Sequence, residues 1–180
     1  MADMGIGLLG APNVIIKRKF RFTFEMQTPA GLVPIWFVKV AARPKLDVEP
    51  TEIAFRNATT WIPGKAKWQP ITVQYIDVPH ASMGALYSWM ANIYNFTQGG
   101  QSKQSEKCGW AGTAIIRMFD GCGTPLEMWE LGSCWPESIN FGDLAYESSE
   151  VATIDVSLRY SEATYTAFCG PNPSGSCCGC

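Results

Sequence analysis

Few residues of this chain have types and spacings that could support catalysis. His80 is the only histidine of the 180 residues, so any Ser–His or Cys–His catalytic pair would have to use it. It follows Pro79 at the expected start of a helix, where a histidine needs no catalytic explanation. Glu127 and Glu130 lie between apolar residues and are expected on the solvated face of a strand. The chain has no Walker loop, no G-x-G-x-x-G and no H-E-x-x-H segment, so we predict no enzyme activity and no cofactor.

The cysteines offer one weak metal motif. Cys177 and Cys180 have the C-x-x-C spacing of a zinc site, and Cys169 and Cys178 are nearby. The second C-x-x-C pair or the paired histidines that would make this signal specific are missing. The seven cysteines are an odd number and follow no recognisable export signal, so reduced thiols are the default expectation. The sequence therefore predicts no metal site.

The composition points to one domain that assembles with other protein chains. A length of 180 residues suits a single domain with a sizeable core. Only 17% of the residues are charged and the formal net charge is −2, which argues against a broad basic surface for nucleic acid. Seven Trp, nine Phe and six Tyr are many for so few charges, and aromatic residues are enriched at interfaces. No apolar stretch approaches the roughly 20 residues that cross a bilayer, so we expect no membrane contact.

The other elements are arranged around residues 68–96. The segment WQPITVQYIDV alternates apolar and polar residues, which predicts a half-buried strand. Apolar residues then recur at helical spacing, which predicts one long helix at about residues 79–97. No charged residue occurs between Asp77 and Lys103, so a second surface is expected to cover the other helix face, either within the domain or from a neighbouring subunit. The candidates for an intersubunit contact on this helix are Ser88, Trp89 and Asn92.

Strand patterns flank this helix on both sides. In KFRFTFEMQ and in VATIDVSLRY, apolar side chains alternate with polar ones. Between Pro44 and Pro70 prolines break the pattern, which predicts a long loop. Phe55, Trp61 and Ile62 in this loop would be costly to leave in water, so we expect them to contact another copy of the chain. The order of elements predicts a mainly β fold, an antiparallel β-barrel or sandwich with one flanking helix.

The two ends of the chain differ in composition from the middle. Residues 1–17 are rich in Gly, Ala and Met and are predicted to form an N-terminal arm. Residues 169–180 are rich in Gly, Pro, Ser and Cys and are predicted to form a flexible tail. The β-domain is then expected at residues 18–168. Its last strand, 151–160, lacks the Lys and Pro residues that protect an exposed edge, so we expect this strand to pair with another subunit.

The order of these patterns resembles the tail tube protein of contractile-tailed bacteriophages. The resemblance starts with PITVQYIDVPHASMGALYSWMANIYNF, a strand followed by a helix with the central Trp89. A strand ending in Asp120-Gly121 and a strand centred on Trp129 come next. The chain continues with a Pro segment before an S-I-x-F strand, at residues 136–141, and a last strand ending in Tyr160. The resemblance covers about residues 18–168, and the related Hcp and pyocin-type tubes share the fold.

This resemblance implies a structural subunit of the virion tail that is made and assembled in the host cytoplasm. Such subunits form six-membered rings that stack into a tube inside a contractile sheath. The implied partners are other copies of the chain and the sheath, tape measure, baseplate and tail terminator proteins, and DNA passes through without specific binding. A tube initiator or baseplate protein, an injection-system tube subunit and a monomeric β-barrel binding module remain alternatives.

The polar faces of the first and last strands are candidates for the channel surface. A channel through which DNA slides should have little net positive charge, because each contact of Lys or Arg with a phosphate holds the duplex. On both faces the basic residues have acidic neighbours on the same strand. The lumen-facing candidates are Arg21, Thr23, Glu25, Asp155, Ser157 and Arg159, and the ring-stacking candidates are Phe55, Trp61 and Ile62.

Overall fold

The computed structural model describes five stretches of the chain, residues 17–79, 83–95, 100–101, 107–147 and 149–168. The predicted arm, except Lys17, and the predicted tail at 169–180 lie outside the described residues, and so does His80. Within the described residues, antiparallel strands dominate and one 11-residue helix flanks them. This arrangement confirms the predicted mainly β fold.

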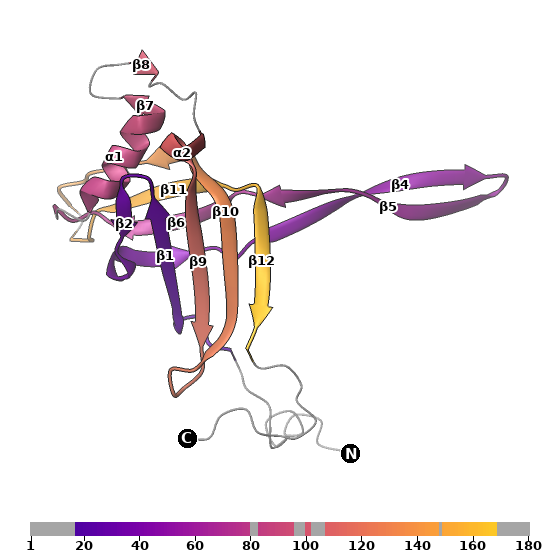
Figure 1. Ribbon diagram of the computed structural model, residues 1–180, viewed down its shortest axis with the longest axis horizontal. Helices are drawn as coiled ribbons and strands as arrows, with labels where there is room; N and C mark the ends of the chain where they lie inside the picture. The colour runs from indigo at the N-terminus through magenta and orange to yellow at the C-terminus, as the bar shows by residue number, and fades with distance from the viewer. Residues whose placement is uncertain (1–16, 80–82, 96–99, 102–106, 148, 169–180) are drawn as a thin grey trace.

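One eight-stranded antiparallel sheet forms the body of the molecule (Figure 1). Its strands follow the order β2, β1, β9, β10, β11, β6, β3, and β12 also pairs with β10. The 16-residue strand β10 joins two halves of this sheet. Its first part pairs with β9 and β12 in one half, and its second part pairs with β11 in the other. The bounds are β1 Phe22–Thr28, β2 Gly31–Val33, β3 Val38–Ala41, β6 Ile71–Ile76, β9 Gly112–Phe119, β10 Pro125–Asn140, β11 Thr153–Arg159 and β12 Glu162–Ala167.

Irregularities in β10 allow the sheet to bend over itself. The pairing register shifts between Leu131 and Cys134 and again between Pro136 and Ser138, and Ser133 has φ 53°. A bulge bends its strand and increases the local twist. The two halves therefore face each other in a sandwich that does not close into a barrel. In Figure 1, β9 and β12 run steeply across the direction of β6 and β11.

The core lies between the two halves of the sheet. Along β1, Phe24 and Met26 are fully buried while Glu25 and Gln27 face outward, as the alternation predicts. The Phe24 ring meets the Tyr75 ring edge-on at 6.5 Å. Each such side chain contributes about 1.5–3 kcal/mol by leaving water. The largest fully buried side chains are Trp89, Tyr75, Phe24, Met26, Ile71, Met83, Leu86, Leu131, Ile154, Leu158, Val33 and Val73.

The helix α1, Met83–Ile93, is shorter than the predicted helix at 79–97. Its C-terminal end comes early because residues 94–95 form β7 (Tyr94–Asn95), which pairs with β8 (Gly100–Gln101). Two short helical turns complete the elements, the 3-10 helix η1 at Ile35–Phe37 and α2 at Lys107–Trp110.

Residues 45–69 form a long β-hairpin, so the prediction of a loop between Pro44 and Pro70 was wrong. The strands β4 (Lys45–Phe55) and β5 (Ala58–Gln69) pair with each other and project from the body (Figure 1). The prolines do not break this ladder, because Pro50 and Pro63 lie opposite each other next to a register shift.

The strand β11 is an inner strand of the sheet, which corrects the expectation of an exposed edge. It pairs with β10 on one side and with β6 on the other. The sequence could not show this, because an inner strand with one solvated face has the same alternation as an edge strand. Within the described residues, free edges of the eight-stranded sheet include those of β2, β3 and β12 and the first part of β1.

Candidate assembly interface

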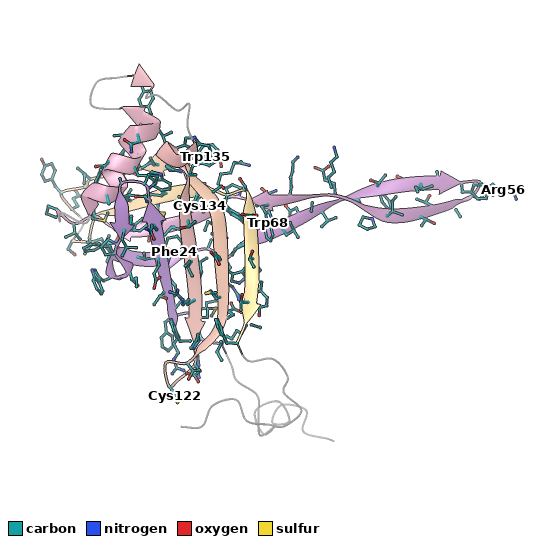
Figure 2. The ribbon with its side chains drawn as sticks, in the orientation of Figure 1. Phe24, Arg56, Trp68, Cys122, Cys134 and Trp135 are labelled. Carbon is teal, nitrogen blue, oxygen red and sulfur yellow. The ribbon has the colours of Figure 1, made fainter. Side chains whose placement is uncertain are left out.

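The outer part of the hairpin exposes apolar side chains on both of its faces. Residues directly opposite each other in an antiparallel pair point to the same side. One face has Phe55 at the tip with Ile53 and Ile62 behind it, and the other has Trp61 directly opposite Glu52. Phe55 is 70% exposed and Trp61 is 60% exposed. The three predicted stacking residues are thus exposed near the hairpin tip (Figure 2 labels Arg56 there), but they divide between two faces.

This hairpin has no third strand among the described residues to stabilise it. A two-stranded hairpin alone is at best marginally stable in water. Monomeric proteins rarely expose large apolar patches, and such patches mark interaction sites. The hairpin therefore has the properties of a segment whose apolar faces are buried by another molecule.

The base of the hairpin is fixed to the body by aromatic packing. The Trp68 ring, next to the end of β5, lies 5.9 Å from the Tyr160 ring just after β11. Trp68 is half-buried and packs against the core cluster. The outer part has no such aromatic contact with the body among the described residues, so the apolar side chains change from partly covered to exposed along the hairpin.

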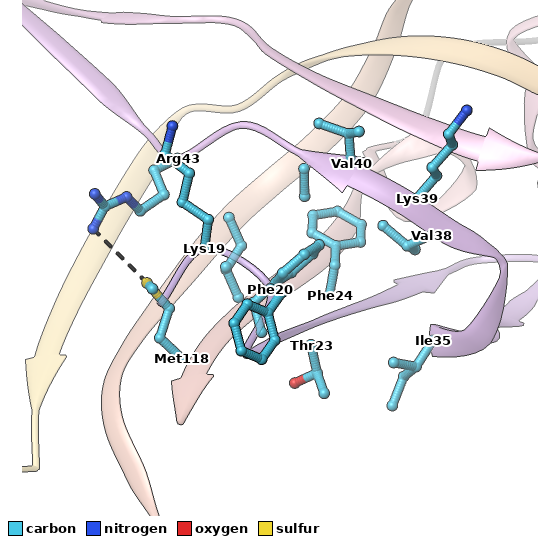
Figure 3. A pocket seen from close by; sticks show the side chains of 13 residues that line it. Lys19, Phe20, Thr23, Phe24, Ile35, Val38, Lys39, Val40, Arg43 and Met118 are labelled. Carbon is cyan, nitrogen blue, oxygen red and sulfur yellow. Dashed lines mark hydrogen bonds between the residues drawn. The ribbon is translucent and has the colours of Figure 1, made fainter. Parts of the chain in front are cut away.

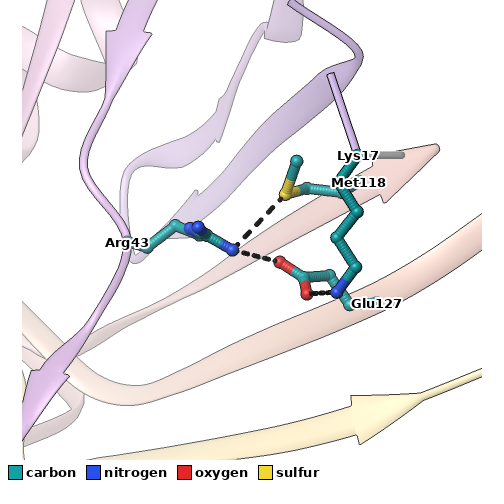
Figure 4. Close-up of polar contacts among 4 residues, drawn as sticks. All are labelled: Lys17, Arg43, Met118 and Glu127. Atoms are coloured by element: carbon teal, nitrogen blue, oxygen red, sulfur yellow. Dashed lines mark hydrogen bonds and ion pairs between the residues drawn. The ribbon is translucent and has the colours of Figure 1, made fainter. Parts of the chain in front are cut away.

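A buried carboxylate fixes the chain just before the hairpin. The Glu127 side chain on β10 is only 3% exposed and accepts hydrogen bonds from Lys17 Nζ and from Arg43 Nη1, the latter at 2.9 Å (Figure 4). Burial alone would raise the pKa of Glu127, but the hydrogen bonds and charges of Lys17 and Arg43 outweigh it, so the pKa is lowered. Glu127 therefore ties the first described residue and the hairpin entrance to the sheet.

Glu127 is not on the solvated face of its strand, so the prediction from its apolar neighbours was wrong. Glu130 is exposed as expected, but Glu127 lies beside the buried Leu126, so its part of β10 departs from strict alternation. The register shift between Pro125 and Glu127 accounts for this change. The two cations come from 84 and 110 residues away along the chain, a distance at which sequence spacing carries no signal.

The lumen-facing candidates lie on the outer faces of the two sheet halves. On β1, Glu25 forms an ion pair with Arg117 at 2.6 Å, and the Thr23 hydroxyl is buried. The two halves pack across one core, so their outer faces point to opposite sides of the subunit. Only one of them can border a given channel, and the sequence could not reveal this.

The polar side chains of the β11 face contact residues of the neighbouring strands. Gln74 on β6 donates a hydrogen bond to Asp155 at 2.9 Å. Arg159 forms an ion pair with Glu137 at 2.6 Å. Ser157 lies between these two residues on the same face and is half-exposed.

The helix candidates are divided between the surface and the core. Ser88 and Asn92 are exposed on α1. Trp89 is fully buried and its indole Nε1 donates a hydrogen bond to the Trp110 carbonyl at 2.7 Å. Trp89 thus packs within its own subunit and not on the exposed helix face. Successive residues of a helix point in different directions, so Trp89 faces the core although Ser88 beside it faces outward.

The described residues contain no constellation for catalysis or metal chemistry. Among them, no three His, Cys, Asp or Glu side chains are grouped so as to hold a metal ion. The C-x-x-C pair lies outside the described residues. Cys134 is a free thiol whose pKa is raised to about 12 by burial, whereas Cys122 is disulfide-bonded, so the expectation of reduced thiols was wrong there. The described chain has no helix with the length and hydropathy needed to cross a membrane.

Comparison with solved structures shows a shared fold. A chain of the anti-feeding prophage cap, described as a tube terminating cap, is 19% identical with TM-score 0.65, covering 91% of this chain and 99% of that chain. A chain of the sheath-tube complex of an extracellular contractile injection system is 15% identical with TM-score 0.59, covering 93% and 99%. Hcp1 from E. coli EAEC 042 is 12% identical with TM-score 0.50, covering 83% and 92%.

Comparison of the sequence itself is more specific. No match was found among curated proteins. The model of one family, described as T4-like virus tail tube protein gp19, matches residues 18–164, which confirms the resemblance inferred from the order of patterns. Because this match spans most of the sequence, the chain belongs to the family of the T4-like virus tail tube protein gp19, whose members are structural proteins and not enzymes.

Proposed function

We propose that this protein is the repeating subunit of a phage tail tube, in which hexameric rings stack into a conduit for DNA. The observation that carries this proposal is the hairpin β4–β5, which extends from a well-packed body and exposes apolar side chains on both faces. A subunit of this form suits a polymer, because the body folds by itself and the hairpin acquires its stabilising contacts on assembly. Family membership supports the tube, and the hexameric ring and DNA conduit are carried over from the resemblance.

In the proposed assembly the hairpin bridges one ring to the next. Phe55, Trp61 and Ile62 supply the apolar contact, and hairpins of one ring reach subunits of the ring beside it. The hairpin continues the direction of β3 and β6 (Figure 1), so these strands would run roughly along the tube. A closed wall of strands has its strands tilted about 35–45° from the axis, which is compatible with this direction.

This orientation favours the β11 face as the channel surface. Asp155, Ser157 and Arg159 would then face the lumen, and Arg21, Thr23 and Glu25 would lie on the outer side of the tube wall. On the β11 face the charge of Arg159 is offset by Glu137, and Asp155 keeps its negative charge while it accepts a hydrogen bond from the neutral Gln74, so these residues give no net positive charge. A surface without net positive charge would let a duplex slide, because it offers few phosphate contacts.

Other partners follow from the same proposal. The outer side of the tube would contact the sheath, and Ser88 and Asn92 on α1 would contact the neighbouring subunit of the ring. The likeness to a chain of a sheath-tube complex supports the sheath contact. The baseplate, a tail terminator and the tape measure protein are the further partners, with DNA passing through unbound. Residues 1–17 and 169–180 are proposed as terminal segments outside the β-domain at 18–168.

A second candidate function is a subunit at the end of a tube, such as an initiator. The likeness to a tube terminating cap favours it, with TM-score 0.65 against 0.59 for the chain of the sheath-tube complex. An injection-system tube subunit would share the same assembly contacts. Growth separates these candidates, because a tube subunit polymerises repeatedly and an end subunit stops at one ring.

Sedimentation velocity and negative-stain microscopy of the purified protein test the proposal. We expect ring-sized particles at low concentration and tubes of variable length at high concentration. A 19.8 kDa monomer at every concentration, also with sheath and baseplate partners present, would contradict it. Single rings that never stack would favour the end subunit.

A further inference from the structure

The open side of the sandwich holds an apolar cavity between β1 and β3, here called the seam. Its volume is about 670 Å³ and it is lined by residues of β1, β3, β9 and the segment before β1 (Figure 3). Phe22, Phe24 and Ile116 contribute its apolar lining. Lys19 and Lys39 contribute two exposed ammonium groups to the lining, and neither forms an ion pair with a described residue.

Two free strand edges border the seam. β2 pairs only with Met26–Thr28, which leaves Phe22–Glu25 without a described strand on that side. β3 pairs with β6 on one side only, within the described residues. Free edges present unpaired N–H and C=O groups that can receive another strand. Apolar lining and free edges together suit a polypeptide strand better than a small molecule.

The Trp61 face of the hairpin has the complementary chemistry. Trp61 is a large exposed ring, and Glu52 lies directly opposite it on β4. The other two carboxylates of the hairpin are already paired, Asp47 with Lys45 and Glu49 with Lys67. Glu52 is thus the hairpin carboxylate without an ion pair to any described residue. An apolar ring beside an unpaired carboxylate matches an apolar cavity beside unpaired ammonium groups.

The hairpin that fits a seam must come from a second copy of the chain. The 11 residues of β4 extend about 36 Å at the usual rise per residue, and the hairpin points away from its own body (Figure 1). We infer that the Trp61–Glu52 face of one subunit docks in the seam of another, with Trp61 in the cavity and Glu52 paired with Lys39 or Lys19. This inference names the partner surface of the proposed ring-to-ring contact and rests on that function.

Charge reversal in the full-length chain tests the contact. Glu52→Lys brings a further positive charge to the seam, which Lys19, Lys39 and Arg43 already line, and Lys39→Glu or Lys19→Glu removes an attractive one. We expect Glu52→Lys to raise the critical concentration for tube growth about tenfold or more, because like charges at a contact are strongly unfavourable. At least one of the doubles Glu52→Lys/Lys39→Glu and Glu52→Lys/Lys19→Glu should restore growth. Glu49→Lys, on the same strand but outside the contact, is the matched control for a change of net charge.

Photo-crosslinking locates the partner surface directly. With benzoylphenylalanine at position 61, assembled protein should give crosslinked peptides from the β1 or β3 edge of the seam. Tubes whose crosslinks map only to other surfaces would overturn the inference and leave the tube function intact. Failure of both double variants to recover growth would also overturn it. If wild-type protein forms no tubes, the proposed function itself fails.

Discussion

The hairpin and the body are built from similar strand-forming residues but differ in how far their apolar side chains are buried. In the body, β1 and β11 alternate buried and polar side chains, and one face of each strand packs on the core. In the outer hairpin both faces carry apolar residues, and all of these residues are exposed. Apolar residues on both faces are typical of strands covered on both sides. The difference indicates that the body has a core of its own and that the hairpin is completed by other molecules.

The largest effect should come from removing a tryptophan of the body. Trp89→Ala empties a fully buried site and leaves the Trp110 carbonyl without its indole donor. We expect the free energy of unfolding to fall by about 3–5 kcal/mol, as for other buried aromatic residues. Urea denaturation of the unassembled protein measures this. A loss below about 1 kcal/mol would mean that the core around α1 is loosely packed.

Removing a tryptophan of the hairpin should affect assembly and leave the stability of the subunit nearly unchanged. Trp61→Ala truncates an exposed ring, so the unfolding free energy of the subunit should change by no more than about 0.5 kcal/mol. Tube growth should nevertheless be lost, because an aromatic anchor in an interface contributes about 2 kcal/mol or more. Denaturation and electron microscopy of one preparation give both values. A variant that fails to fold would place Trp61 in a core and erase the distinction between hairpin and body.

Weakening the contact between the body and the hairpin entrance should have an intermediate effect on the unfolding free energy. Glu127→Gln removes the charge that binds Lys17 and Arg43, and we expect a loss of about 1–2 kcal/mol in unfolding free energy. Faster hydrogen exchange at residues 43–46 should accompany it. Glu130→Gln, an exposed position of the same strand, is the matched control and should change neither value.

The same pair of variants gives a dependence on pH. The pKa of Glu127 is lowered in the folded state, so its contribution is complete above the unfolded pKa of about 4.3 and is lost as pH falls through the folded pKa. The stability difference between wild type and Glu127→Gln should therefore be constant near neutrality and shrink below about pH 4. A difference that stays unchanged down to pH 2 would show that the charge of Glu127 is not responsible.

The smallest expected effect concerns the two outer faces of the body. Glu25 is paired with Ile115, Ile115 with Glu130, and Glu130 with Thr164, so Thr164 lies on the same outer face as Glu25. Ser157 lies on the other half of the sheet. In assembled tubes, cysteine at position 157 should react more slowly with a bulky polymer-linked maleimide than cysteine at position 164. Peptide mass spectrometry separates these sites from the native cysteines. Faster labelling at position 157 would place the β11 face outside.

Local patterns in the sequence predicted much of the fold. The alternation in β1 and β11 and the helical spacing around Leu86 each depend on near neighbours, and the structure confirms them. The contact of Glu127 with Lys17 and Arg43 and the inner position of β11 depend on pairings between distant segments, which no local pattern encodes. The sequence also identified Phe55, Trp61 and Ile62 as exposed apolar residues, but their division between two faces required the hairpin register.

The prolines illustrate the limit of local reasoning most clearly. A proline normally indicates a break, because it has no N–H to donate to a ladder. In the hairpin, Pro50 and Pro63 face each other beside a register shift, where the ladder is already interrupted. Two residues that separately predict a loop are compatible with a strand when they are placed opposite each other.

In the proposed tube the body folds alone and the hairpin joins neighbouring rings. A cryo-electron microscopy map of tubes grown from the purified protein would show both regions in place. We expect each hairpin to cross into the adjacent ring, with Phe55 and Trp61 covered by other subunits and the β11 face lining the channel. A tube in which the outer hairpin lies in solvent, or folds back on its own subunit while rings stack through other surfaces, would contradict the proposed ring-to-ring contact.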